Sequence, residues 1–143
     1  MKKKKYISIV LVALFIFITI NLLNDYREKN LEDVLSYNPS KFHSLAINFE
    51  LHTTNPSYAE ELTEFLSQYR VKKISAAEWE IEFKAMEGFH VSINSHSRPS
   101  IMATIYEDRI HHYNGNYYKV INGPIDMKRF YSFIEDLEKV PVN

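Results

Sequence analysis

The feature that most constrains this chain is an uncharged, apolar run of 18 residues, Tyr6 to Leu23, which follows four consecutive lysines. A helix rises about 1.5 Å per residue, so the run spans roughly 27 Å, close to the hydrocarbon core of a bilayer at about 30 Å. Such a segment is a poor fit to a soluble fold of this size. The run therefore predicts a transmembrane helix that contacts the lipid bilayer through residues 6–23.

The residues on either side of the run predict its orientation. Lysines precede it and a mixed set follows from Asp25 onward, so the positive-inside rule puts the N-terminus in the cytoplasm and the rest of the chain outside. The segment Ile20 to Tyr26 lacks the pair of small residues that signal peptidase needs. We therefore expect an uncleaved, single-pass signal-anchor in the cell membrane, with a cleaved signal peptide as the alternative. A lipoprotein is excluded because the chain has no cysteine.

Charge and cysteine content exclude several classes of function. The 17 basic residues include the four N-terminal lysines, so 13 basic residues stand against 18 acidic ones beyond the anchor, a net charge of −5. A nucleic-acid binder shows the opposite sign and a clustered basic face, so nucleic acid is not expected as a partner. The lack of cysteine excludes disulfides, thiol catalysis and thiolate metal sites.

The remaining sequence predicts one compact domain behind a short connection. No internal repeat or low-complexity linker interrupts it. We expect a cytoplasmic basic tip and transmembrane anchor over residues 1–24, a stalk or first helix over residues 25–40, and an extracytoplasmic domain over residues 41–143. The helical pattern of the middle part ends at Asn38-Pro39, because proline cannot continue a helix.

Two amphipathic helices are predicted in the domain, together with a strand that precedes them. Phe42 to His52 alternates between apolar and polar residues and predicts one half-buried strand, with Phe49 facing inward. Asn55 is a good N-cap for a helix with Pro56 at its first position. A second helix is expected from an N-cap at Asp126 to about Lys139.

Between these helices, Val71 to Ile121 predicts an antiparallel meander. The segment Glu78 to Lys84 alternates strictly and predicts a strand with Trp79 facing inward. Asn114-Gly115 favours the positive φ values of a type I′ turn and predicts a hairpin. An antiparallel sheet with one apolar face needs a cover, so we predict an α+β, two-layer domain in which two amphipathic helices cover the meander.

The six histidines do not form a recognisable metal site. His90 and His96 lie six residues apart and could share one face of a regular strand, whereas His111 and His112 are adjacent and point to opposite faces. No HExxH motif or paired carboxylate–histidine spacing accompanies them. Exposed strand histidines, with no bound metal and no cofactor, are the expectation.

Catalytic motifs are also lacking. The serines near His90 and His96 (Ser92, Ser95, Ser97 and Ser100) have no nucleophile elbow around them. Three glycines cannot build a glycine-rich phosphate loop. We therefore expect a protein that is not an enzyme, with a hydrolase as the most distant alternative.

Tyrosine is the unusual excess, and it clusters on the last three predicted strands. The four residues of this cluster are Tyr106, Tyr113, Tyr117 and Tyr118. Alternation puts Tyr117 and Tyr118 on opposite faces, so one of the two is expected to be exposed. Exposed tyrosines are typical of recognition surfaces for proteins or sugars, and the cluster is our candidate interaction surface. The alternative is that these tyrosines only pave a small sheet as good strand formers.

The order of elements resembles a known group of proteins. A lysine-rich start and an anchor precede LEDVLSYNPSKFHSLAINF (residues 31–49), and FYSFIEDLEKV (residues 130–140) closes the chain. This pattern resembles small membrane-anchored or lipoprotein extracytoplasmic proteins of unknown function from low-GC Gram-positive bacteria. The resemblance implies a cell-envelope location and transfers no functional residues.

The leading functional hypothesis is therefore a tethered binding module with an accessory, regulatory, immunity or exclusion role. Its expected partner is an envelope protein. The alternative is a small-ligand or cell-wall glycan binder that uses the surface tyrosines.

Overall fold

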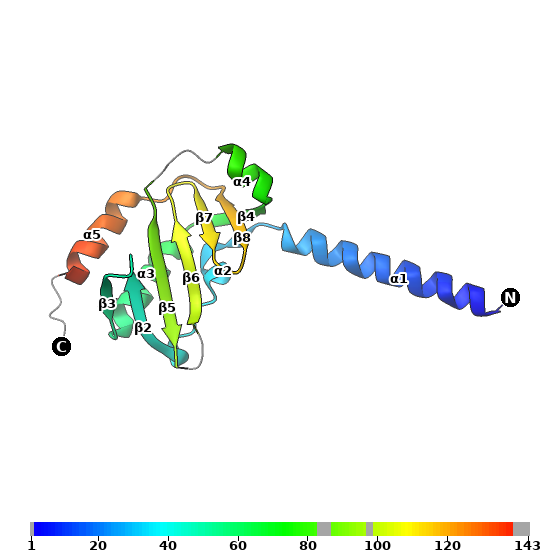
Figure 1. Ribbon diagram of the computed structural model, residues 1–143, viewed down its shortest axis with the longest axis horizontal. Helices are drawn as coiled ribbons and strands as arrows, with labels where there is room; N and C mark the ends of the chain where they lie inside the picture. Colours follow the sequence, from blue (N-terminus) through cyan, green and yellow to red (C-terminus); the bar gives the residue numbers. More distant parts are fainter. Residues whose placement is uncertain (1, 83–86, 97–98, 139–143) are drawn as a thin grey trace.

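A computed structural model of the chain describes residues 2–82, 87–96 and 99–138. The N-terminal helix α1 (Lys2–Asp25) projects away from a folded domain (Figure 1). The domain is built on one eight-stranded sheet with the strand order β1-β4-β8-β7-β6-β5-β2-β3, in which neighbouring strands are antiparallel. The predicted α+β class and antiparallel sheet are confirmed.

The remaining elements follow α1 in a mixed order. The strands are β1 (Lys29–Asn30), β2 (Phe42–Ile47), β3 (Leu51–Thr53), β4 (Arg70–Ile74), β5 (Phe89–Ser95), β6 (Pro99–Ile105), β7 (Arg109–His112) and β8 (Asn116–Val120). The helices are α2 (Leu31–Leu35), the short 3-10 helix η1 (Pro39–Lys41), α3 (Pro56–Ser67), α4 (Ala76–Glu82) and α5 (Met127–Glu138).

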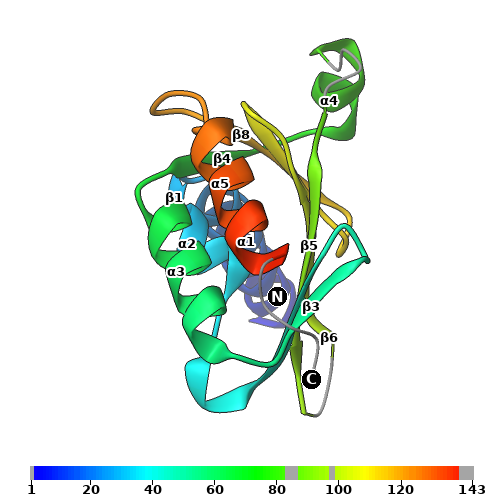
Figure 2. The ribbon, with the colours of Figure 1, turned by 90° about the vertical axis from the view of Figure 1, so that its left-hand side faces the viewer.

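Three helices lie on one side of the sheet, as Figure 2 shows for α2, α3 and α5. Phe89 of β5 stacks on Phe130 of α5, with ring centroids 4.6 Å apart, and Phe65 of α3 meets Phe130 edge-on at 6.3 Å. Phe130 and Leu31 are completely buried, and the inward apolar residues of the central strands are buried with them. The hydrophobic core therefore lies between this face of the sheet and the helices.

Both predicted helix caps are present. Asn55 accepts a hydrogen bond from the Ser57 backbone N–H at 3.1 Å, and Pro56 occupies the first position of α3. The Asp126 carboxylate accepts one from the Arg129 backbone N–H at 3.2 Å, at the start of α5. These bonds satisfy donors that the first turn of a helix otherwise leaves unpaired.

The connection between α1 and the domain is not one continuous helix. The segment 25–40, predicted as a stalk or first helix, leaves α1 after Asp25 and forms β1 and α2. β1 pairs with β4 through Lys29 and Val71, and the Leu31 N–H donates to the Tyr69 carbonyl at 2.9 Å. Pairing with the sheet therefore makes this segment part of the domain.

The single strand predicted over residues 42–52 is wrong, because the chain turns back on itself there. β2 and β3 form a hairpin through Asn48 and Phe49, whose φ values are 50° and 62°. Two consecutive positive φ values and the 3.2 Å hydrogen bond from Glu50 N–H to the Ile47 carbonyl define a type I′ turn. The alternation of apolar and polar residues continues across the turn, so the sequence pattern does not indicate it. Phe49, predicted to face inward, is exposed.

The strand predicted over residues 78–84 is also wrong, since α4 occupies its first part. Ser75 and Glu78 form a capping box: the Ser75 N–H donates to the Glu78 carboxylate at 3.1 Å, and the Glu78 N–H donates to Ser75 Oγ at 3.2 Å. This S-x-x-E pattern outweighs the strand-like alternation because it satisfies helix donors locally. Phe83 and Lys84 lie outside the described residues.

The predicted β7–β8 hairpin is confirmed, but its turn differs from the predicted type I′. His112 pairs with Asn116, so the loop has three residues, and the Gly115 N–H donates to the His112 carbonyl at 3.0 Å. Gly115 has φ 87°, whereas Asn114 does not have a positive φ. A type I turn followed by a left-handed glycine is the usual solution for a loop of this length.

Candidate binding surface

The sheet face opposite the core helices carries the tyrosines that the sequence singled out, together with histidines. Strand register puts four residues in one line across β8, β7, β6 and β5: Tyr117 opposite His111, His111 opposite Thr104, and Thr104 opposite His90. Because neighbours in a strand alternate between faces, this line lies on the side away from Phe89 and the core. We call this side the open face.

Six rings follow one another along this line, and we call them the aromatic row. In spatial order they are Trp79, Tyr117, His111, Tyr113, His90 and Phe49, contributed by α4, β8, β7, the β7–β8 turn, β5 and the β2–β3 turn. Successive ring centroids are 4.9, 4.7, 5.2, 6.1 and 5.0 Å apart. Six segments of the chain thus build one continuous row of rings across the sheet.

The centre of the row is stacked ring on ring. His111 lies between Tyr117 and Tyr113, and its plane is tilted by only 15° and 27° from theirs. The ring of His111 therefore has a stacked neighbour on each side, whereas Tyr113 remains 46% exposed.

Hydrogen bonds hold the middle of the row in place. His90 Nδ1 lies 2.9 Å from Thr104 Oγ1 and 3.0 Å from the Tyr113 hydroxyl. Thr104 is only 3% exposed, so it lies beneath the rings and holds His90 in place through this hydrogen bond. The His90 backbone N–H also donates to the Asn48 side chain at 3.0 Å, which ties the β2–β3 turn to the row.

The imidazole at the centre of the row is biased toward its neutral form. Burial lowers the pKa of His111 below its usual value, and the nearby His90 lowers it further. Removal from water disfavours the charged form of a histidine, and a second imidazole close by adds repulsion when both are protonated. The centre of the row therefore disfavours a positive charge.

The two ends of the row differ. At one end, Trp79 packs α4 against the sheet. The Arg109 guanidinium lies 5.4 Å from the centroid of the Trp79 ring, and the Tyr106 ring meets the Trp79 ring edge-on at 5.7 Å. Arg109 is 3% exposed and forms a two-pronged ion pair with Asp108, at 2.9 and 3.0 Å. At the other end Phe49 is 60% exposed in a left-handed conformation that a bulky residue rarely adopts.

The open face away from α4 is uncharged among the described residues. Register puts Ala46, Ser92 and Met102 in a second line beside the row, and Ser44 opposite Asn94 in a third. The Asn94 amide donates to Ser44 Oγ at 3.1 Å. The charged residues of this face lie instead on the other side of the row, where Lys72, Lys119 and Arg109 pair across β4, β8 and β7.

Three of the four predicted tyrosines gather on this face. Tyr113 and Tyr117 belong to the row, and Tyr106 packs against Trp79. Tyr118 lies on the other face and is buried in the core. Tyr117, the other member of that pair, is half-buried.

Sequence reasoning missed the other members of the row. Period-two alternation placed His90 on an outward face, but nothing in the sequence showed that it would align with His111. His96, predicted to share a face with His90, lies instead against His43, with ring centroids 4.8 Å apart. In residues 2–82, 87–96 and 99–138 no group of three or more potential ligands could hold a metal ion.

A second polar cluster joins α1 to the domain. Asp25 forms an ion pair with Lys73, Glu28 forms one with Arg70, and the Lys73 ammonium lies 5.6 Å from the Tyr26 ring. The bond from Lys73 to Asp25 raises the pKa of Lys73.

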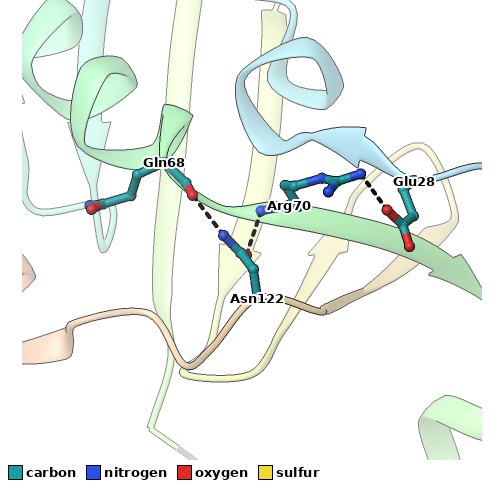
Figure 3. A network of polar contacts seen from close by, with 4 residues as sticks. All are labelled: Glu28, Gln68, Arg70 and Asn122. Atoms are coloured by element: carbon teal, nitrogen blue, oxygen red, sulfur yellow. Dashed lines mark hydrogen bonds and ion pairs between the residues drawn. The ribbon is translucent and has the colours of Figure 1, made fainter.

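Figure 3 shows how this junction continues into the domain. The Arg70 N–H donates to the Asn122 side chain at 2.7 Å, and the Asn122 amide donates to the Gln68 carbonyl at 2.8 Å. Asn122, which follows β8, is therefore bound to both sides of the short connection between α3 and β4. This connection lies next to the point where Glu28 binds Arg70.

One helix of the described chain is long and apolar enough to cross a membrane, over Tyr6–Asp25. Its large apolar side chains are exposed rather than packed on the domain. A signal sequence near an N-terminus has the same length and composition. Comparisons with protein-family models, curated proteins and solved structures found no match to this chain.

Proposed function

We propose that this chain is a membrane-tethered, extracytoplasmic binding module of the bacterial cell envelope, which contacts a protein through the open face of its sheet. The observation that carries the proposal is the aromatic row on a face without core helices. In this proposal the helices form one layer and the sheet the other, and α1 holds the module at the membrane. The envelope setting rests on the resemblance of the chain to anchored Gram-positive proteins.

The polar side chains of α1 support the membrane part of the proposal. Thr19 Oγ1 donates to the Phe15 carbonyl and Asn21 Nδ2 to the Phe17 carbonyl, both at 2.9 Å. Each bond returns a polar group to the helix's own backbone, four residues back. A lipid-exposed helix needs this, because the hydrocarbon core provides no other partner.

The composition of the open face supports a protein partner. The cores of protein interfaces are depleted in charged residues and enriched in tyrosine, tryptophan, phenylalanine and methionine. The open face has this composition around Tyr113, Met102 and Phe49, while Lys72 and Lys119 lie to one side. Rigid rings that are already stacked also lose little conformational freedom on binding.

The stacking argues against the glycan alternative. A sugar ring would pack flat against an exposed aromatic face, but both faces of His111 are occupied by Tyr113 and Tyr117. The two exposed rings of the row, Tyr113 and Phe49, are separated by His90 and do not form one broad stacking platform. The catalytic alternative gains no support from the row, in which His90 contacts Thr104 and Tyr113 and no carboxylate contact is observed within the described part of the chain.

The test is comparative affinity capture of the full-length, tagged chain from its native membrane. Tyr113→Ala removes an exposed ring of the row, and Tyr131→Ala removes a similarly exposed tyrosine of α5 as the matched control. We expect one protein in stoichiometric amount with the wild type and the control, and its loss with Tyr113→Ala. Equal capture by both variants, or retention of the full-length chain by cell-wall glycan, would contradict the proposal.

A separate measurement tests the anchor. A cysteine introduced in the domain should react with a membrane-impermeant maleimide added to intact cells, and the membrane fraction should contain the chain at its full 16.9 kDa mass plus the label. Release of a shortened chain would favour the signal peptide instead.

A further inference from the structure

The open face is directed sideways relative to the anchor. In Figure 1 the helix α1 lies across the page while β5 and β6 are seen broadside. In Figure 2 the view runs along α1, and the sheet is seen edge-on with the core helices on one side. A helix that crosses a membrane lies within a modest tilt of its normal. The open face therefore points along the membrane surface rather than away from it.

The junction holds the domain in this orientation. Only residues 26–28 separate α1 from β1, and the two ion pairs, Asp25–Lys73 and Glu28–Arg70, bridge this connection. Asp25 also lies 3.6 Å from Lys29. A single exposed ion pair stabilises little, but several contacts across so short a link, together with the β1–β4 pairing, restrict swivelling of the domain on its anchor.

We propose that the open face is an interface between two copies of this chain in the same membrane, related by a twofold axis parallel to α1. This rests on the proposed function in one respect, namely that α1 stays attached. Two anchors inserted in the same direction can be related by such an axis, and twofold dimers are the commonest oligomers. The axis brings two sideways-pointing faces into contact without moving either domain away from the membrane.

The charge pattern fits this symmetry. The strands β5 and β6 run across the direction of α1 (Figure 1), so the aromatic row runs along it, from the β8 side next to the anchor to the β2–β3 turn. An axis along the row places row against row. The facing side chains are then tyrosines and histidines, and burial favours the neutral form of His111.

In this arrangement the charged line of one copy does not face the charged line of the other copy. The charged line lies on one side of the row and consists of Lys72, Lys119 and Arg109. The β7–β8 turn, residues 113–115, leaves the same strands on the other side. A twofold rotation about the row exchanges the two sides. Among the described residues, the lysines of one copy therefore face the uncharged turn of the other copy rather than its lysines.

The sequence provides a clean test, because it has no cysteine of its own. Ser92→Cys is a nearly isosteric change on the open face, and Glu135→Cys places a cysteine on the exposed side of α5 as the control. The full-length variants in membranes are treated with a short bis-maleimide. We expect Ser92→Cys to shift to twice the 16.9 kDa monomer mass and to join two differently tagged copies, and Glu135→Cys to stay monomeric.

A second variant tests the symmetry. Tyr113→Lys in the Ser92→Cys chain would place a lysine of the turn against Lys72 and Lys119 of the other copy, so the cross-linked dimer should be lost while the Trp79 fluorescence of the folded domain remains. Equal cross-linking of Ser92→Cys and Glu135→Cys, no cross-linking of Ser92→Cys, or its cross-linking to a different protein would each overturn the dimer.

The same membranes separate the two proposals. A full-length chain that reacts from outside but stays monomeric contradicts the dimer alone. A shortened or released chain contradicts the tethered module, whatever its cross-linking.

Discussion

Both faces of the sheet carry stacked aromatic rings, but in different surroundings. On the core face Phe89 and Phe130 stack and are removed from water by α3 and α5. On the open face Tyr113, His111 and Tyr117 stack on one another, and Tyr113 remains 46% exposed. Burial from water stabilises a fold in proportion to the apolar area that is covered. The comparison indicates that the core face provides stability and leaves the open face available for contact.

The strongest test of this difference is Phe130→Ala. Phe130 is completely buried and contacts Phe65, Phe89 and Phe133. Removing such a ring leaves a cavity as well as losing burial, so the free energy of unfolding should fall by about 3–5 kcal/mol. Tyr113→Ala on the open face should change it by less than about 1 kcal/mol. Urea unfolding of the detergent-solubilised full-length chain, followed by Trp79 fluorescence, measures both, and equal losses would remove the distinction between the faces.

Trp79→Ala tests the one place where the open face is covered. The ring packs on Tyr117 and Tyr106 and lies under the Arg109 guanidinium. Its loss should cost about 1–3 kcal/mol and should mainly release α4, since the core face is untouched. Hydrogen exchange should therefore increase in residues 76–82 and not in β5 or α5. Uniformly faster exchange would mean that α4 belongs to the cooperative core.

Elements with a local cause were predictable from the sequence, whereas those with a long-range cause were not. The caps at Asn55 and Asp126 and the β7–β8 hairpin depend on residues within one or two turns of the chain. The turn at Asn48 and Phe49 depends on a contact with His90, 42 residues away. Alternation alone could not distinguish a long strand from a hairpin there, because apolar residues continued on both sides of the turn.

The α4 error has a different origin. Ser75 and Glu78 form a capping box that is recognisable in the sequence. The alternation of Trp79 and its neighbours predicts a strand over the same residues, so the two patterns conflict. For the candidate surface, the sequence identified Tyr106, Tyr113 and Tyr117 through their spacing. It could not identify Trp79, His90 and Phe49 as members, because strand order and register bring these segments together.

Ser75→Ala tests whether that capping box holds α4. The change removes the side-chain partner of the Glu78 N–H, and loss of a serine cap typically costs about 1 kcal/mol. The helix should fray from its N-terminus, which hydrogen exchange at residues 76–79 would report. Ser67→Ala at the C-terminal end of α3 is the matched control and should leave α4 unchanged. Unchanged exchange in Ser75→Ala would assign the stability of α4 to Trp79 alone.

The smallest expected effect is the pH dependence of the open face. Burial lowers the pKa of His111 in the folded chain, so the unfolded chain binds more protons as pH falls through the usual histidine value of about 6.5. The contribution of His111 to stability is thus fully present above that value and is lost as pH falls toward its lowered folded pKa.

His112 is buried on the core side and its pKa is lowered for the same reason, so it titrates in the same direction. His111→Gln should therefore reduce the pH dependence of the urea midpoint between pH 7.5 and 5.5 without abolishing it, and the double variant with His112→Gln should reduce it further. Acidification should reduce cross-linking of the Ser92→Cys chain, because protonated His111 of one copy would lie close to that of the other. The two single variants distinguish the two faces. If His112→Gln protected the dimer from acid and His111→Gln did not, the acid-sensitive group would lie on the core face. The row would then not be the contact surface.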